Sequence, residues 1–461
     1  MENQALKELF QGEVLTALDD AALQTYLDDQ LIMDVAELID EFPELGKRIL
    51  TILSIQRAVS VFKILDFPLQ EDLIEELSEE RVKEIINDLP PDDRTGLLED
   101  LPGNVVKDLL KLLNQEELKI SLKLLGYPED SVGRRMTPDY LDVKEEWTVK
   151  EGLEHIRHYG KDSETIDVVY VINKEGKLVD DLRIREFLLV NPDEKIVNLT
   201  DGRYTSLKVT DTQEEAITIF RKENRVALPV INENKILLGI VTIDDILSVA
   251  NEEYTEDLQM MGGNEALEEP YLDINLFKLF RKRGGVLLIL FIGEMLTATA
   301  MQHYQDAGVF LNFADLILFI PLILSCGGNS GSQATTLIVQ AIALGEATIK
   351  DWWKIIRREF FSGLLLGILL GTIGFLRIAS WQIFNIYDYG PHWVLMASTI
   401  FFALIGVILW GSLMGSMLPI ILKKMGLDPA TSSAPFVATI VDVTGIIIYV
   451  SVAMIVLQHV I

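Results

Sequence analysis

The sequence predicts a multi-domain integral membrane protein in which soluble regions precede a transmembrane domain of five α-helices. The chain has 461 residues and a formal charge of −30, yet only 9 acidic and 7 basic residues lie at 284–461. The acidic charge is therefore concentrated at 1–283, and the remainder is nearly neutral and apolar. That remainder contains five apolar segments long enough to cross a bilayer of about 30 Å. A chain of this length also exceeds the usual size of one hydrophobic core.

Residues 1–133 are predicted to form an acidic, all-α domain. Apolar residues recur at helical spacing in VAELIDEFPE and EDLIEELSEERVKEIINDLP. A short pattern of leucine, acidic residues and proline recurs at NDLPPDD, EDLPGN and LLGYPED. Because proline ends or begins helices, the repetition predicts a short superhelical stack of helix pairs. The negative charge argues against nucleic acid as a partner and favours hard divalent cations, which prefer carboxylate oxygens.

The next region alternates short β-branched runs with helical segments. The order strand, helix, strand, strand, helix occurs twice, at 134–199 around VVYVIN and at 200–252 around ALPVIN. This α/β pattern resembles a tandem pair of CBS modules. In the second copy, Thr242 and Asp245 form the T-x-x-D arrangement that holds phosphate and ribose in nucleotide-binding members of that family, so the resemblance implies ATP or another adenine nucleotide as a ligand. The alternative is a helix N-cap beside a solvated acid.

Residues 253–283 are predicted to connect the soluble domains to the membrane. They contain an acidic helical stretch, a Gly-Gly break and an amphipathic helix that leads into the first span. A rod in this position, a connecting or plug helix, could couple a sensor to a pore.

The transmembrane domain is predicted at 284–461. Its apolar runs lie at 284–303, 312–345, 360–383, 393–421 and 430–459. The second run is interrupted by GGNSGSQATT, where we expect an irregular segment. Lysine and arginine precede the first span and lie between spans 2 and 3 and between spans 4 and 5. The positive-inside rule therefore predicts a multi-pass protein of the cell (inner) membrane with a cytoplasmic N-terminus and an outer C-terminus.

Asp442 is the one acid within the last apolar run. A carboxylate at bilayer depth costs about 3 kcal/mol, so such residues usually face a bundle interior or a watery path. A helical projection at about 100° per residue places mostly small or polar positions on its face, with Ile446 as the one bulky aliphatic residue. These positions are Asp428, Thr431, Pro435, Ala438, Thr439, Gly445, Ile446 and Tyr449.

The GGNSGSQATT segment offers glycines beside amide and hydroxyl groups, which suit either a pore lining or close packing of helices. The predicted pore-lining residues are Gly328, Asn329, Ala438 and Gly445. Glu294 in the first span is likewise open to two interpretations, a polar packing bond or a pore-side role.

Over its full length the chain resembles the bacterial MgtE-type family of magnesium channels. The resemblance is carried by the domain order together with GGNSGSQA and PFVATIVDVTG. It implies a homodimer with one pore on its symmetry axis, Asp442 as the pore ligand of hydrated Mg²⁺, and gating by cytosolic Mg²⁺. The candidates for regulatory Mg²⁺ sites are Asp428, Asp257, Glu256, Glu268, Glu269, Asp92 and Asp93.

Two other functions stay open at this point: transport of another divalent cation such as Ca²⁺, Mn²⁺ or Co²⁺, and a CBS-containing membrane receptor. A pore built from oxygen ligands without Cys or His favours Mg²⁺ over Zn²⁺. An inside-negative potential contributes about 4.6 kcal/mol per 100 mV to the entry of a divalent ion, so no pump is required. We expect no enzymatic activity, because one acid without a base, nucleophile or metal cluster makes no catalytic site.

Overall fold

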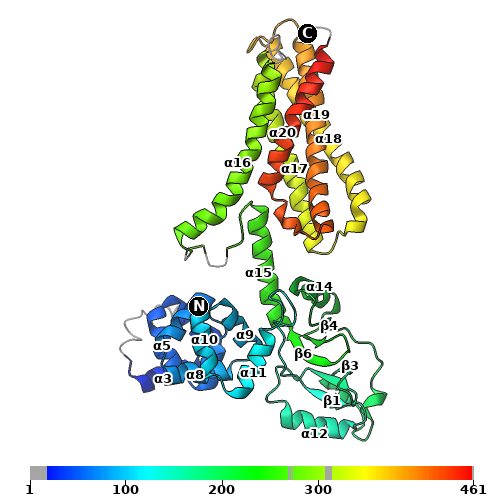
Figure 1. Cartoon of the computed structure of the whole chain (residues 1–461). Helices are drawn as coiled ribbons and strands as arrows, with labels where there is room; N and C mark the ends of the chain where they lie inside the picture. The colour runs from blue at the N-terminus through cyan, green and yellow to red at the C-terminus, as the bar shows by residue number, and fades with distance from the viewer. Residues whose placement is uncertain (1–17, 268–270, 273, 307–313, 459–461) are drawn as a thin grey trace. The chain divides into compact units, whose positions relative to one another are not determined.

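The computed structural model describes residues 18–267, 271–272, 274–306 and 314–458. The chain divides into two compact units, Met1–Ala250 and Asn251–Ile461 (Figure 1). Each unit has hydrophobic cores of its own.

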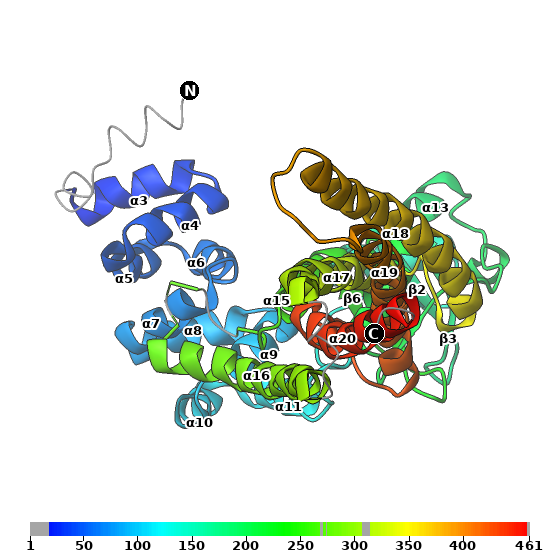
Figure 2. The same cartoon turned by 90° about the horizontal axis from the view of Figure 1, so that it is seen from above.

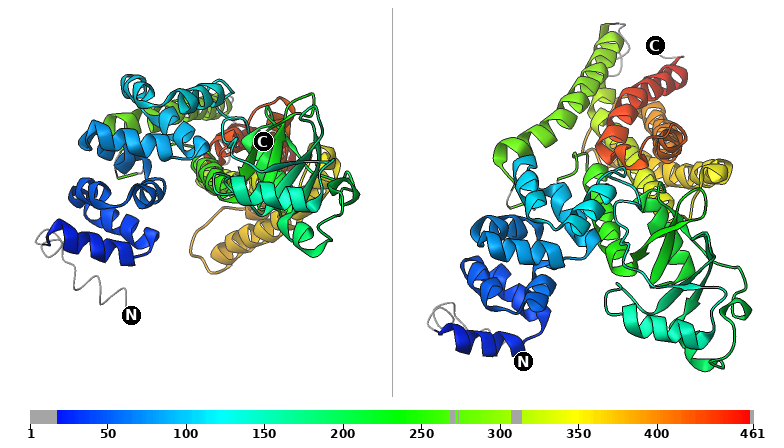
Figure 3. Two further views of the ribbon diagram at one scale, coloured as in Figure 1. Left: turned by 90° about the horizontal axis from the view of Figure 1, so that it is seen from below. Right: turned by 60° about the horizontal axis from the view of Figure 1, so that its bottom comes forward.

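The first unit begins with short helices stacked side by side around one continuous core (Figure 3). They are α3 (Asp20–Asp29), α4 (Ile32–Glu41), α5 (Pro43–Ile52), α6 (Ile55–Phe62), α7 (Phe67–Glu76), α8 (Glu79–Asp88), α9 (Pro91–Asp100), α10 (Gly103–Leu112) and α11 (Gln115–Leu124). Proline stands in the first turn of α5, α7 and α9. It lacks an N–H that would be unpaired there in any case, so it begins a helix without loss. The predicted helical stack is confirmed.

Two α/β modules follow with the same order of elements. The first has β1 (Asp142–Lys144), α12 (Val149–Tyr159), β2 (Val168–Ile172), β3 (Leu178–Arg183), α13 (Ile184–Leu189) and the short helix η1 (Ile196–Asn198). The second has β4 (Leu207–Lys208), α14 (Gln213–Glu223), β5 (Ala227–Ile231), β6 (Leu237–Thr242) and α15 (Ile243–Met261). In each three-stranded sheet the first pair is parallel and the second antiparallel. This confirms the predicted repeat.

The segment that connects the α/β modules to the first span begins and ends at other residues than predicted. α15 starts directly after β6 and runs for 19 residues, so the acidic helix continues the last helix of the second module. It ends at a Gly-Gly turn in which Gly263 has φ +79°, a conformation that favours glycine. α16 (Leu276–Asp306) then joins the amphipathic segment and the first span in one helix of 31 residues. No proline separates these segments, so the helix continues.

Five helices in the described part of the second unit are long and apolar enough to cross a membrane, as predicted. After α16 come η2 (Ala314–Phe319), α17 (Ile320–Ala343), η3 (Ile349–Asp351), α18 (Trp352–Ile383), α19 (Trp393–Lys424), η4 (Pro429–Thr431) and α20 (Ala434–Leu457). The expected irregularity at GGNSGSQATT is wrong, because α17 is helical throughout that segment. In a bilayer each backbone group must be paired internally, which keeps even a glycine-rich segment helical.

α19 packs against α17, α18 and α20 (Figure 2). Glycines lie at tight contacts between these helices. A Cβ atom built on Gly415 of α19 would collide with the carbonyl oxygen of Gly331 on α17, and one on Gly411 with that of Gly327. On the other side of α19, a Cβ on Gly367 of α18 would lie 2.8 Å from the Cα of Ile405. Small residues allow such backbone contact, which replaces hydrophobic driving force as the source of helix association in lipid.

Gly415→Val is expected to disrupt the α17–α19 contact, because its side chain has no space beside Gly331. Overpacking of this kind typically costs 1–3 kcal/mol, and we expect at least about that loss here. The measurement is thermal unfolding of the purified protein in detergent. Gly284→Ala is the matched control, since the nearest atom to its Cβ would be 3.9 Å away. Equal melting temperatures for the two variants would contradict this account of the packing.

Candidate functional site

Asp442 lies near the middle of α20, where three helices meet. It is half-buried, and its carboxyl group hydrogen-bonds Glu294 of α16. On the side of α17, a Cβ on Gly328 would lie 3.8 Å from Asp442 Oδ1 and 3.4 Å from the Cβ of Ala438. Glycine at 328 therefore lets the backbone of α17 approach the carboxylate.

The residues of GGNSGSQATT divide between the two predicted roles. Gly327 and Gly331 are buried against Val407 and Gly411 of α19 and against α20, so they serve helix packing. Gly328 faces α20 beside Asp442. Asn329 is exposed in the single chain, and its Nδ2 lies 3.4 Å from the hydroxyl of Ser325. Packing and polar exposure thus occupy different faces of the same helix.

The exposed face of α17 carries a row of polar side chains. At spacings of three and four it contains Ser325, Asn329, Gln333, Thr336 and Gln340, and all of them are exposed in the single chain. An uncharged polar row on a lipid face would leave its hydrogen-bonding groups unsatisfied, so we expect it to face water or another subunit. The sequence analysis did not identify Ser325, Thr336 or Gln340 as site residues, although their helical spacing is visible in the sequence.

The projected stripe on α20 is shorter than expected. α20 begins at Ala434, so Asp428 lies outside the helix, where its carboxylate accepts a hydrogen bond of 2.8 Å from the backbone N–H of Ala430. The prolines at the start of this segment break the projection. Further along, Gly445 is buried against Leu324 and Val407. Around Ala438, Thr439 and Asp442 the stripe is partly exposed.

The end of the connecting segment contacts the start of α20. Gly263, in the turn after α15, is buried, and a Cβ built on it would lie 3.0 Å from Cγ of Pro435. The Nζ of Lys282 on α16 donates a 2.6 Å hydrogen bond to the carbonyl oxygen of Ala266. The turn is thereby seated between α16 and α20.

The predicted regulatory acids of the connecting region are partly described. On α15, Glu256 is exposed and Asp257 is half-buried. Glu268 and Glu269 lie outside the described residues.

In the first unit, Asp92 and Asp93 in the first turn of α9 meet acids of the α/β modules. We call Asp92, Asp93, Glu164, Asp244 and Asp245 the acidic cluster. Asp92 is only 6% exposed, and its Oδ1 is buried without a hydrogen-bond partner among the described residues. Burial raises the pKa of Asp92 well above its usual range, and the charges of Asp245 and Asp93 add to that rise. Lys63, 3.5 Å from Asp93, supplies partial compensation.

The predicted nucleotide motif takes part in the same cluster. Thr242 Oγ1 donates a 2.6 Å hydrogen bond to Asp245 Oδ2. Asp245 also hydrogen-bonds Asp92, and burial raises the pKa of its carboxyl group. Asp245 is therefore directed at α9 of the helical domain. Sequence spacing alone did not indicate this contact.

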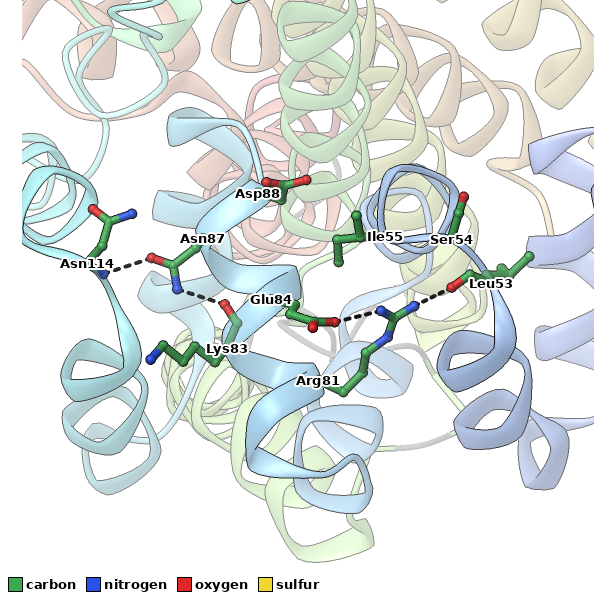
Figure 4. Close-up of a pocket in the computed structure, with 9 residues that line it drawn as sticks. All are labelled: Leu53, Ser54, Ile55, Arg81, Lys83, Glu84, Asn87, Asp88 and Asn114. Carbon is green, nitrogen blue, oxygen red and sulfur yellow. Dashed lines mark hydrogen bonds and ion pairs between the residues drawn. The ribbon is translucent and has the colours of Figure 1, made fainter.

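The helical domain also has an open groove between α6, α8 and the start of α11 (Figure 4). Arg81 in this groove donates hydrogen bonds to the backbone carbonyls of Leu50 and Leu53 and to Glu84, so it holds neighbouring helices together. The groove contains none of the site residues predicted from the sequence. Its charges are of both signs and do not converge on one point.

Within the described residues, no three His, Cys, Asp or Glu side chains are arranged to hold a metal ion. The acidic cluster and the Asp442–Glu294 pair therefore each fall short of such a set.

Comparisons with known proteins match three parts of this chain. A family model described as a divalent cation transporter, MgtE, matches residues 320–452, the model of the MgtE intracellular N domain matches 31–130, and a CBS domain model matches 195–252. The magnesium transporter MgtE of Thermus thermophilus is 33% identical over 334 residues, 72% of each protein. That of Bacillus subtilis is 28% identical over 445 residues, 95% of this chain and 96% of the relative.

Among solved structures, this chain is similar to the cytosolic domain of the Mg²⁺ channel MgtE in complex with ATP. It has 30% identity and a TM-score of 0.49, and the match covers 52% of this chain and 98% of that one. The Thermus transporter is more than 30% identical over more than two thirds of both proteins, and MgtE models match both the N domain and the membrane region, so this chain belongs to the MgtE family of magnesium transporters.

Proposed function

We propose that this protein is a Mg²⁺-selective channel that admits Mg²⁺ down its electrochemical gradient and is gated by cytosolic Mg²⁺. The observation that carries the proposal is Asp442, a half-buried carboxyl group in mid-span where α16, α17 and α20 meet. A membrane anchor has no need of such an acid, whereas an ion pathway does.

The ligand chemistry fits hydrated Mg²⁺. Mg²⁺ gives up water reluctantly and usually retains several waters while using one or two carboxylates. A homodimer would bring two Asp442 side chains to its two-fold axis as a ring of carboxylates. The amide and hydroxyl groups of the α17 row, Asn329 among them, could then hydrogen-bond the waters of the ion along its path.

The direction of the protein in the membrane follows from its basic loops. Lys350 lies in η3, between α17 and α18, Lys354 lies in the first turn of α18, and Lys423 and Lys424 lie at the end of α19. The positive-inside rule places these loops in the cytoplasm, with the C-terminus outside.

Asp442→Asn is expected to reduce Mg²⁺ uptake by at least about tenfold, because an amide has no charge to attract the ion. Uptake is measured in cells that lack other Mg²⁺ uptake systems, and in liposomes with Mg²⁺, Ca²⁺, Mn²⁺ and Co²⁺ in parallel. Glu346→Gln, a change at an exposed position in the α17–α18 loop, is the control and should retain wild-type uptake. Normal uptake by Asp442→Asn would refute the channel, and faster flux of another ion would refute Mg²⁺ selectivity.

We infer that the gate responds to Mg²⁺ through the acidic cluster. Buried carboxylates of like charge repel each other, and Oδ1 of Asp92 has no hydrogen-bond donor among the residues that the structure describes. A divalent ion bound there would offset the repulsion and favour contact between the helical domain and the second α/β module. By linkage, such an ion stabilises the closed state only if it binds that state more tightly.

The contact between Gly263 and Pro435 gives this signal a route to the pore. The turn after α15 packs directly on the first turn of α20, the helix that carries Asp442. A displacement of α15 would therefore act on the pore helix without an intervening element. Glu256, Asp257, Glu268, Glu269 and Asp428 remain predicted Mg²⁺ ligands in this region.

ATP or another adenine nucleotide remains a predicted ligand of Thr242 and Asp245. Both side chains are already engaged, Thr242 with Asp245 and Asp245 with Asp92. A ribose bound to Asp245 would have to displace Asp92. Nucleotide binding and docking of the helical domain would then compete for one carboxylate.

Asp92→Asn is expected to stabilise the docked helical domain at pH 7.5 in EDTA by about 1–3 kcal/mol, the usual cost of an unsatisfied buried group. Because folding raises the pKa of Asp92, its contribution to stability is present at low pH and is lost as pH rises through the raised pKa. The stability of the docked helical domain should therefore depend less on pH in Asp92→Asn than in the wild type. Hydrogen–deuterium exchange of α9 in the full-length protein measures this.

In Mg²⁺ the order of stability should reverse, with the wild type more stable than Asp92→Asn, because asparagine is a poorer Mg²⁺ ligand than aspartate. Inhibition of uptake by cytosolic Mg²⁺ should then require higher Mg²⁺ concentrations in Asp92→Asn. Asp88→Asn is the control, since Asp88 is an exposed acid at the end of α8. Unchanged exchange and unchanged inhibition in Asp92→Asn would contradict the role of the acidic cluster.

A further inference from the structure

The first transmembrane helix places a second carboxyl group beside Asp442. Glu294 lies in the apolar part of α16, and its side chain hydrogen-bonds Asp442. It is exposed in the single chain, although its neighbours Met295 and Leu296 are apolar. An acid that faces hydrocarbon at this depth is costly, so its position marks a boundary with water or protein.

α16 is closely seated on α20 at this level. A Cβ built on Gly293 would lie 2.5 Å from Cγ2 of Thr439, one turn before Asp442. Glycine at 293 thus allows the two helices to approach, and the next residue, Glu294, is brought to Asp442. The close approach of the two helices at Gly293 thus places Glu294 beside Asp442.

Thr297, one turn beyond Glu294, provides an independent observation. Its side chain is only 7% exposed, and its Oγ1 is buried without a hydrogen-bond partner among the described residues. Thr299, on the same helix, shows the ordinary arrangement, since its hydroxyl donates a 2.8 Å hydrogen bond to the carbonyl oxygen of Met295. The hydroxyl of Thr297 is buried on the side of α16 that carries Gly293, with bonding capacity left for a water molecule.

We propose that Glu294 is a second acidic ligand of the pore site and that Thr297 holds a water of the bound ion. This inference rests on the proposed function, because it takes Asp442 as the pore ligand. Two carboxylates within hydrogen-bonding reach repel each other unless a cation or a proton lies between them. A hydrated Mg²⁺, which uses one or two carboxylates and keeps its other waters, matches two acids and a free hydroxyl.

The consequence concerns affinity and selectivity for divalent ions. One subunit supplies two carboxylates instead of one, and a two-fold dimer would supply two such pairs. A higher density of negative charge favours divalent over monovalent cations. Glu294 is thus assigned to the selectivity of the pore, on a helix outside the two motifs that pointed to the pore in the sequence.

The test is Mg²⁺ flux into liposomes at a series of Mg²⁺ concentrations for wild type, Glu294→Gln, Glu294→Asp and Thr297→Val. Glu294→Gln should raise the concentration for half-maximal flux about tenfold, as expected for the loss of a charged ligand, and should increase Na⁺ leak relative to Mg²⁺ flux. Glu294→Asp, which retains the carboxylate, should restore most of the affinity. Thr297→Val, which is isosteric, should raise the concentration for half-maximal flux about threefold.

Glu359→Gln is the matched control, an acid-to-amide change in α18 away from the α16–α20 contact, and should behave as wild type. Wild-type affinity and selectivity in Glu294→Gln would overturn the role of Glu294, and wild-type affinity in Thr297→Val would overturn that of Thr297. Asp442→Asn, measured beside them, separates the two proposals. Loss of flux in Asp442→Asn with normal Glu294→Gln refutes only the role of Glu294, whereas normal flux in Asp442→Asn refutes the channel itself.

Discussion

The structure of the membrane unit depends on the cost of placing a carboxyl group in hydrocarbon. A carboxyl group at position 442 would be costly if lipid surrounded it, so the adjoining helices must supply polar neighbours for Asp442. Gly328 brings the backbone of α17 to it, Glu294 of α16 bonds it, and the polar row of α17 lies on an adjacent face. The same constraint explains why glycines occupy the contacts between α17 and α19. Close packing there leaves the other face of α17 available for polar groups.

Like-charge repulsion is the corresponding constraint in the soluble unit. The acidic cluster gathers carboxyl groups from the helical domain and from the α/β modules, with burial raising the pKa of Asp92 and Asp245. Such an arrangement is stable when protons or cations offset the charge and unstable when they are absent. A contact between domains with that property is suited to sense a divalent cation. It also places the T-x-x-D motif of the second module within a domain contact.

The two constraints belong to separate units, and α15 links them along the chain. It begins as the last helix of the second α/β module and ends at the turn that packs on Pro435. The turn at Gly263 requires a positive φ, which fixes where the helix stops.

The sequence by itself determined the five spans, the helical stack, the repeated α/β modules and Asp442 as the acid of interest. Hydropathy, helical periodicity and proline positions are local properties, and each can be recognised from a short stretch of sequence. The tertiary structure decided how the faces of α17 divide between packing and exposure, and that Asp245 meets Asp92. It also decided that α20 starts too late to include Asp428, and that Glu294 bonds Asp442. These depend on contacts between segments far apart in the chain, and local periodicity carries no information about which distant helix a given face will meet.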